Sequence, residues 1–251
     1  MNIQLIRNAT MILMYAGRVI LTDPMLSTKG EIRSFAGIAQ NPTVELPMPA
    51  KDVIKGIDSV LVSHVHPDHF DKPGSELLPK EIPLFCQPED KNRMTEEGFR
   101  QVIPVVNSFT WEGITIIRTG GKHGSGNILE RMGTVSGFVL QAKGEPTVYW
   151  VGDSIWCEEV ENTIKTYKPD VIITHSGGAT IPGFEPIIMD ANQTLKVLNA
   201  APNAKVVAIH TESLDHCTVT RKMLREMSDR EKILSTRFLI PNDGEKISLE
   251  K

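Results

Sequence analysis

Five apolar runs in this chain of 251 residues each lead into a residue that can bind a metal ion. They are SVLVS before His64, ITIIRTGGK before His123, TVYWVG before Asp153, DVIIT before His175 and KVVAI before His210. Near-continuous apolar runs are typical of strands that are buried on both faces and covered by helices. The pattern therefore predicts an α/β fold whose ligand-type side chains gather at the carboxyl ends of core strands, where sites form in open sheets.

The segments between these runs have helical patterns. We expect helices at residues 89–97, 158–167 and 191–198, and another after Thr220 in RKMLREMS. Before the third of these, Asp190 is the predicted N-cap, and Gln193 follows three residues later as in a capping box.

The N-terminal part is predicted to be strands, at residues 2–15 and 18–23, with a hairpin turn at Ala16–Gly17. The segment 23–49 is rich in proline and glycine and predicts a long irregular connection. Loops of that length in compact domains are usually functional or flexible, so we expect this one to lie over a site. Because no low-complexity segment or long linker interrupts the pattern, we expect a single domain over residues 1–251.

The composition suits a globular protein, with 40% hydrophobic and 23% charged residues. The net charge of -4 gives no general attraction to nucleic acid or to anionic membranes. We therefore expect a small-molecule substrate as the partner, with neither nucleic acid nor membrane. The sequence leaves the oligomeric state open, a homo-oligomer included.

The three cysteines, Cys86, Cys157 and Cys217, are far apart and form no C-x-x-C pair, which argues against a disulfide framework. The first residues, MNIQLIRNAT, show no basic segment followed by an apolar one, as a secretory signal would. The longest apolar run is interrupted by Gly17 and Arg18 and is too short to span a bilayer. These features predict a soluble, cytoplasmic protein.

The segment His64-Val65-His66-Pro67-Asp68-His69 gathers four ligand-type side chains within six residues. Imidazole and carboxylate groups are good ligands for Zn²⁺ and similar divalent ions. His64 and His66 can reach one point while Asp68 and His69 reach a second. Solvated or helix-capping histidines are a poor explanation for so dense a set, and one loop cannot fill two coordination spheres. The motif therefore predicts further ligands from distant parts of the chain.

This H-x-H-x-D-H motif resembles the signature of the metallo-β-lactamase superfamily. The resemblance extends over nearly the whole chain, from VILTDP through YWVGDS to IPNDGEKI. The segments HGSGN, MGTVSGFVL and HTESLDHCTVTR are similar to the branch that contains L-ascorbate-6-phosphate lactonase and related metal-dependent hydrolases.

The resemblance implies a four-layer αβ/βα sandwich with a dinuclear metal site along one edge of its two sheets. It also implies a ligand set: His64, His66 and His123 for the first metal, Asp68, His69 and His210 for the second, and Asp153 bridging both. The implied cofactors are two divalent metal ions, zinc first, with manganese or iron as alternatives.

Some of these residues have other interpretations. Asp153 is also placed to cap the following helix. The glycines around His123 suggest a phosphate loop, but no G-K-[ST] ending follows, so a metal ligand is favoured. At the last strand end, His210 is the predicted ligand, and His216 in the next loop is a predicted substrate contact. His175 has no counterpart in the family signature, and we interpret it as a histidine of the pocket.

Several further residues are candidates for supporting roles. Asp23 is predicted to orient a ligand imidazole. Trp156 and Phe184 suit the pocket wall and the core equally well. The basic residues considered for an anionic substrate group are Lys29, Arg33, Lys122 and Arg131, although solvated surface charge is the favoured interpretation of each.

The predicted activity is hydrolysis of an ester, lactone, amide or phosphodiester bond in a small substrate by a metal-bridged hydroxide. Asp68 would orient the hydroxide or carry its proton, and His216 or His175 would donate a proton to the leaving group. A di-iron oxidoreductase on the same fold is the first alternative, and its relatives usually carry a carboxylate where this chain has His66. A non-catalytic metal-binding or nucleic-acid-binding protein is the second, but every expected ligand position holds a ligand-type residue.

Overall fold

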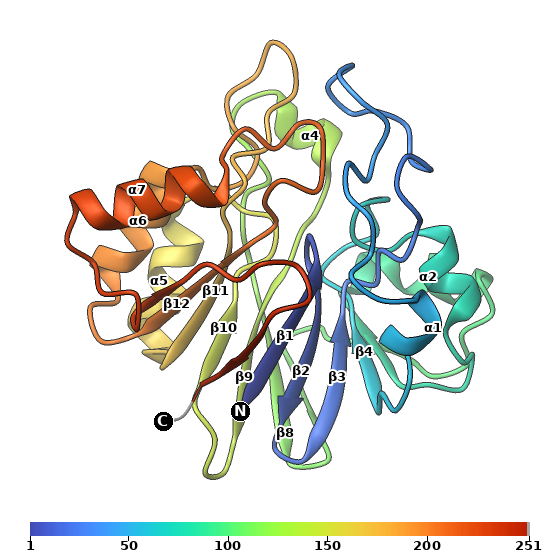
Figure 1. Ribbon diagram of the computed structural model, residues 1–251. Coiled ribbons are helices and arrows are strands. Elements are labelled where there is room, and N and C mark those ends of the chain that lie inside the picture. The colour runs from blue at the N-terminus through green and yellow to red at the C-terminus, as the bar shows by residue number, and fades with distance from the viewer. Residues whose placement is uncertain (250–251) are drawn as a thin grey trace.

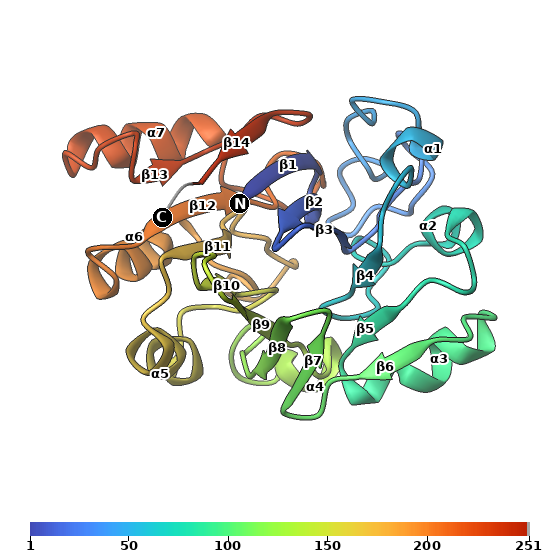
Figure 2. The ribbon, with the colours of Figure 1, turned by 90° about the horizontal axis from the view of Figure 1, so that it is seen from below.

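A computed structural model of the protein describes residues 1–249. Two seven-stranded sheets pack face to face, with helices on the outer face of each (Figure 1). Viewed from below, the two sheets lie between two groups of helices, α1 to α3 beside one sheet and α5 to α7 beside the other (Figure 2). This is the four-layer αβ/βα sandwich that the family resemblance implied.

The first sheet contains the N-terminal strands together with the last one of the chain. Its strands are β1 (Asn2–Arg7), β2 (Thr10–Tyr15), β3 (Arg18–Thr22), β4 (Ser59–Leu61), β5 (Leu84–Cys86), β6 (Val102–Pro104) and β14 (Lys246–Ser248). They lie in the order β14-β1-β2-β3-β4-β5-β6, antiparallel from β14 to β3 and parallel from β3 to β6.

The second sheet repeats this plan with the other strands. They are β7 (Ser108–Trp111), β8 (Ile114–Thr119), β9 (Gly137–Ala142), β10 (Val148–Trp150), β11 (Val171–His175), β12 (Lys205–Ile209) and β13 (Phe238–Leu239). Strands β7 to β10 are antiparallel and β10 to β13 are parallel, in the order β13-β12-β11-β10-β9-β8-β7. Strands β8, β10, β11 and β12 therefore run in the same direction, and their carboxyl ends meet at one edge.

The helices follow the strands they cover. They are α1 (Ala50–Val53), α2 (Lys72–Leu77), the 3-10 helix η1 (Pro88–Asp90), α3 (Lys91–Glu96), α4 (Ile128–Met132), α5 (Glu158–Tyr167), α6 (Ala191–Ala200) and α7 (Arg221–Arg230). The helix predicted at 158–167 is confirmed at both ends, and the one predicted at 191–198 continues to Ala200. The helix predicted at 89–97 is instead η1 followed by α3. No helix within residues 1–249 is long and apolar enough to cross a membrane.

The sheets are held together by an apolar layer to which both contribute. Leu5 and Leu13 of the first sheet pack in one cluster with Ile116, Phe138 and Trp150 of the second. Alternate residues on the second sheet point the other way and pack under α5, α6 and α7. The strands are thus buried on both faces, as the near-continuous apolar runs predicted.

Two local features differ from the sequence predictions. Residues 2–15 form two strands, because the chain turns at Asn8, whose φ of 58° lies in a region that asparagine tolerates better than most residues. At the start of α6, the Asp190 carboxylate accepts a hydrogen bond from Gln193 N as predicted. The Gln193 side chain does not complete the capping box, since its oxygen accepts instead from Trp156 N.

The irregular segment 23–49 is attached to the first sheet by a buried arginine. Arg7 is 0% exposed and donates from Nη2 to the carbonyl oxygens of Met25 and Ser27 and from Nη1 to that of Val44. Burial lowers the pKa of Arg7 to about 10, although Asp71 and other acidic residues raise it. The guanidinium therefore fixes both ends of this segment against β1.

We expect Arg7→Met to lower the free energy of unfolding by at least about 2 kcal/mol, because it leaves buried carbonyl oxygens without donors. Arg100→Met is the matched control. It removes an exposed ion pair with Glu81, of the kind worth at most about 1 kcal/mol. Denaturant unfolding followed by circular dichroism compares the two, and equal stabilities would contradict this role of Arg7.

Candidate metal centre

The predicted ligand residues meet where the carboxyl ends of strands from both sheets come together. The segment 64–69 follows β4 in the first sheet, while His123, Asp153 and His210 follow β8, β10 and β12 in the second. Backbone hydrogen bonds from His69 N and Phe70 N to His66 O fold the segment 64–69 into a compact turn. The core packing of the sheets thus sets the positions of the side chains.

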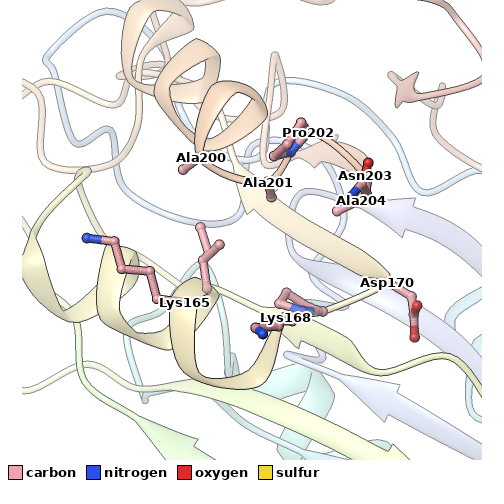
Figure 3. A pocket seen from close by; sticks show the side chains of 10 residues that line it. Lys165, Lys168, Asp170, Ala200, Ala201, Pro202, Asn203 and Ala204 are labelled. Atoms are coloured by element: carbon pink, nitrogen blue, oxygen red, sulfur yellow. The ribbon is translucent and has the colours of Figure 1, made fainter.

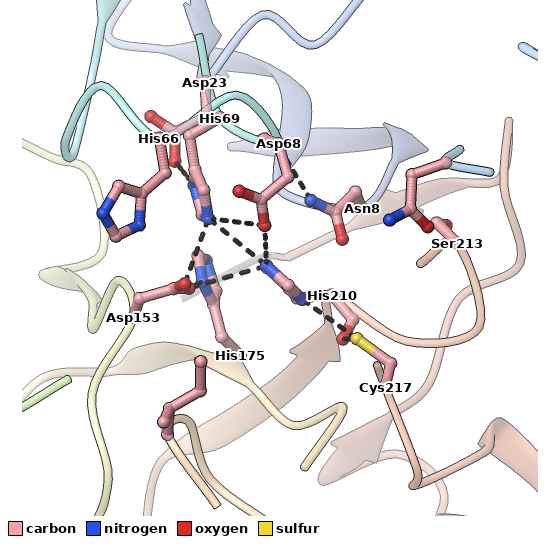
Figure 4. A network of polar contacts seen from close by, with 12 residues as sticks. Asn8, Asp23, His66, Asp68, His69, Asp153, His175, His210, Ser213 and Cys217 are labelled. Atoms are coloured by element: carbon pink, nitrogen blue, oxygen red, sulfur yellow. Dashed lines mark hydrogen bonds and ion pairs between the residues drawn. The ribbon is translucent and has the colours of Figure 1, made fainter. Parts of the chain in front are cut away.

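Two groups of ligand atoms form the centre. His64, His66 and His123 make one group, and His69, Asp153, His175 and His210 make the other. Within each group, one ligand atom from every residue lies within 4.8 Å of the others. Asp68 adjoins the second group, with its Oδ2 3.5 Å from His69 Nε2 and 3.4 Å from His210 Nε2 (Figure 4). The structure therefore brings together all seven residues that the sequence predicted as ligands.

One oxygen of Asp153 faces both groups. Its Oδ2 lies 3.1 Å from His69 Nε2, and 3.4 Å and 4.0 Å from Nε2 of His123 and His64. The alternative role as a helix cap is not seen, since the N-cap of α5 is Cys157. This placement is the one that a bridging carboxylate requires.

The electrostatics of the centre favour bound cations. Burial raises the pKa of Asp153, but His69 and His210 outweigh it and hold that pKa well below its usual range. Burial lowers the pKa of His69, but Asp153, Asp68 and Asp23 together raise it well above its usual value. Burial lowers the pKa of His123 to about 4, which leaves its imidazole neutral at pH 7.

The donors also converge in a way that suits metal binding. Nε2 of His64 lies 2.9 Å from Nδ1 of His66, and Nε2 of His69 lies 3.3 Å from Nε2 of His210. Buried imidazole nitrogens that face one another beside anionic carboxylates are a donor set for divalent metal ions. These residues therefore fit the divalent metal ions that the family resemblance implied.

A layer of hydrogen bonds behind the ligands holds the imidazoles. Asp23 lies 2.6 Å from His69 Nδ1, as predicted, and accepts from Ser63 N and Ser63 Oγ. Ser63 Oγ in turn lies 3.0 Å from His64 Nδ1. One buried carboxylate thus fixes a ligand in each group.

The turn at Asn8 links the two sheets at the same place. Its side-chain Nδ2 donates to the carbonyl oxygen of Asp68, and its own carbonyl oxygen accepts from His210 N. Asn8 was not predicted as part of the site. Its role depends on a tight turn between β1 and β2 that the apolar pattern alone did not reveal.

His175 lies behind Asp153 and does not line the cavity, which differs from its predicted place as a pocket histidine. It is 0% exposed, with Nδ1 2.5 Å from Asp153 Oδ1. Trp150 Nε1 donates to His175 Nε2 over 2.9 Å. Because an indole N–H only donates, Nε2 must accept, so the proton lies on Nδ1 and is donated to Asp153. His175 therefore orients Asp153 and leaves Oδ2 directed at both groups of ligands.

A cavity of about 440 Å³ opens over the centre. From the metal centre and its neighbourhood it is lined by His66, Pro67, Asp68, His123, Asp153 and His216. Three other segments complete it with Arg33, Ser34, Phe35, Arg131, Met132, Ile181 and Ile187. The prediction that segment 23–49 lies over a site is thus met by residues 33–35.

Other predicted cavity residues have different places. Trp156 packs against the apolar cluster under α5 to α7. Phe184 is 39% exposed and belongs neither to the cavity wall nor to the core. Arg33 and Arg131 do reach the cavity, although solvated surface was the favoured interpretation. Sequence patterns carry no signal that separates an arginine at a cavity rim from one on open surface.

A second hollow of about 400 Å³ lies between the carboxyl ends of α5 and α6 (Figure 3). Its lining includes Lys165, Lys168 and Asp170 but no histidine or cysteine. Asp170 is engaged there in accepting from Thr147 N. This hollow therefore holds no set of catalytic side chains among the described residues.

We expect His175→Leu to weaken metal binding by about 10- to 100-fold, the usual effect of removing a group that orients a ligand. His175→Asn is the matched variant, because its amide can donate from nearly the position of Nδ1 and should restore most of the affinity. Competition with a chromophoric chelator measures both affinities, and thermal melts exclude misfolding. Unchanged affinity in His175→Leu would contradict the orienting role.

We expect His210→Ala to lose much of the metal of the second group, because His210 supplies one of its few ligand atoms. His216→Ala should keep its metal, since His216 lines the cavity outside both groups. Mass spectrometry of the intact proteins reads the metal content. If His216→Ala loses metal while His210→Ala does not, the assignment at this end of the chain is wrong.

Comparison with known proteins identifies the family. The β-lactamase superfamily domain matches residues 18–211. UPF0173 protein YddR of Bacillus subtilis is 37% identical over 251 residues, covering 98% of both chains. A UPF0173 metal-dependent hydrolase of Azorhizobium caulinodans is 23% identical over 212 residues, covering 80% of this chain and 84% of its own.

Among solved structures, isothiocyanate hydrolase from Delia radicum gut bacteria superposes with a TM-score of 0.95. It is 34% identical, and the match covers 100% of both chains. The finer resemblance to the L-ascorbate-6-phosphate lactonase branch is not tested by these matches and stays a prediction. The chain belongs to the β-lactamase superfamily, among the UPF0173 metal-dependent hydrolases.

Proposed function

We propose that this protein is a dinuclear metal-dependent hydrolase of a small molecule, with zinc as the first choice of metal and manganese or iron as alternatives. The observation that carries the proposal is the placement of Asp153 Oδ2 between two separate groups of imidazoles. His64, His66 and His123 would hold one ion, and Asp68, His69 and His210 the other. The bond cleaved would be an ester, lactone, amide or phosphodiester bond.

When bound, divalent ions supply a water that ionises near neutral pH and a Lewis acid for the electrophilic group of the substrate. Asp68 lies in the cavity wall beside this position. Burial raises the pKa of Asp68, but His69 and His210 outweigh it and hold that pKa well below its usual range. The Asp68 carboxylate is therefore anionic, and it would orient the attacking water and accept its proton.

His216 is the proposed substrate contact. It lies in the cavity wall, and its ring meets that of Phe35 edge to face at 5.0 Å. Burial lowers the pKa of His216, so its imidazole is neutral at pH 7. A neutral imidazole at this position would donate a hydrogen bond from its N–H group to the substrate or to its leaving group.

An isothiocyanate is a second candidate substrate. The solved isothiocyanate hydrolase matches this chain over its full length at 34% identity. In such a reaction, water adds to the electrophilic carbon of the N=C=S group and the adduct releases an amine and carbonyl sulfide. The apolar side chains of Met132, Ile181 and Ile187 in the cavity wall would suit an apolar substituent on the nitrogen.

Protein purified without chelator should contain close to two divalent ions per chain. A screen of lactones, esters, amides, phosphodiesters and isothiocyanates with zinc- and manganese-loaded protein should then find a hydrolysed class.

On a substrate found in that screen, Asp68→Asn should turn over at least ~100-fold more slowly, because the variant keeps the shape of the side chain but loses its positioned carboxylate. A chain that binds no metal, or near-normal turnover by Asp68→Asn, would refute the proposed mechanism.

A further inference from the structure

The cavity over the metal centre contains a polar side chain without a partner. His216 is 6% exposed and lines the cavity, yet its Nδ1 is buried and has no hydrogen-bond partner within the described residues. Buried polar groups in folded proteins are nearly always hydrogen-bonded, and an exception calls for an explanation. The wall of the cavity therefore includes a histidine with one nitrogen that no described residue satisfies.

The same cavity contains two arginines that are free of protein partners. Neither the Arg33 nor the Arg131 side chain forms a hydrogen bond or an ion pair within residues 1–249. Each of the other arginines forms at least one: Arg7, Arg18, Arg93, Arg100, Arg118, Arg221, Arg225, Arg230 and Arg237. Both residues with uncommitted guanidinium groups thus line the same cavity, and both are exposed at its rim.

The chain beside Arg33 is held at the cavity rim by hydrogen bonds to Asp215, which we call the Asp215 anchor. The carboxylate of Asp215 accepts from the side chains of Ser34 and Asn41 and from the backbone N–H groups of Phe35, Ala36, Ile38 and Ala39. Asp215 directly precedes His216 in the chain. The anchor therefore fixes the segment after Arg33 and the cavity histidine together.

Away from the metal centre, the cavity wall also contains apolar side chains. These apolar residues are Phe35, Met132, Ile181 and Ile187. Among the described residues, the carboxylates of the wall are those of Asp68 and Asp153 in the metal centre. An apolar wall with two free guanidinium groups is complementary to a ligand that has an apolar body and an anionic group. Guanidinium groups bind carboxylates and phosphates through paired, charge-assisted hydrogen bonds.

We propose that Arg33 and Arg131 bind an anionic group of the substrate, remote from the bond cleaved, while the apolar walls hold its body. The substrate class is then a small apolar molecule with one carboxylate-type anion. This inference rests on the proposed function, since it places the reacting bond of the same molecule over the metal centre. Arg33 and Arg131 act as specificity-determining residues and take no part in the chemical step.

The test compares the binding of two probes of nearly the same shape, phenylacetate and phenylacetamide, to zinc-loaded protein by isothermal titration calorimetry. The wild-type protein should bind phenylacetate more tightly than phenylacetamide. In Arg33→Gln/Arg131→Gln, phenylacetate should bind about 10-fold more weakly, while the affinity for phenylacetamide stays unchanged. The matched control is Arg100→Gln/Arg230→Gln, which removes the same charge from exposed ion pairs elsewhere.

A carboxylate can also bind zinc directly. Metal content is therefore measured in every sample. If phenylacetate bound to zinc alone, its affinity for Arg33→Gln/Arg131→Gln would equal that for the wild type at the same zinc content. No preference for phenylacetate in the wild type, unchanged affinity in the double variant, an equal loss for both probes, or an equal loss in the control variant would overturn the proposal. Protein that holds no metal but still prefers phenylacetate through the two arginines would refute the proposed function and leave the anion site intact.

Discussion

The carboxylate of Asp153 is the contact on which the arrangement of the site depends. One of its oxygens faces imidazoles that come from both sheets, and the other is held by His175. The imidazoles of the first sheet and those of the second would not meet without the apolar layer that fixes the distance between the sheets. Core packing, which is non-directional, thus places groups whose chemistry is strongly directional.

Charge sets a second constraint on this centre. Asp23, Asp68 and Asp153 are buried together, and the nearby residues that could balance them are histidines. Burial of several carboxylates is costly unless cations compensate them. Any divalent ion that binds the folded chain better than the unfolded one also stabilises the fold. A divalent ion held by this centre would therefore couple metal binding to folding.

Much of this fold and site can be predicted from the sequence, for identifiable physical reasons. A strand buried on both faces leaves a continuous apolar run, so the positions of His64, Asp153 and His210 at strand ends are visible. The dense motif at 64–69 and the pattern of α5 are local and are equally visible. The turn at Asn8 and the pairing of Trp150 with His175 depend on contacts between distant segments, which no local pattern encodes. The exposed arginines of the cavity rim look in sequence like any other surface charge.

The Asp215 anchor holds residues 34–41 in place without the help of the metal ligands, so this loop and the metal centre are structurally separate. Residues 34–41 are attached through their own backbone and side chains to one carboxylate, and none of them belongs to the two groups of ligand atoms. Exchange of side chains on that segment changes the shape and charge of the cavity while leaving the metal ligands in place. The hydrogen bonds to Asp215 thus hold the part of the loop that shapes the cavity without using any side chain of the two ligand groups.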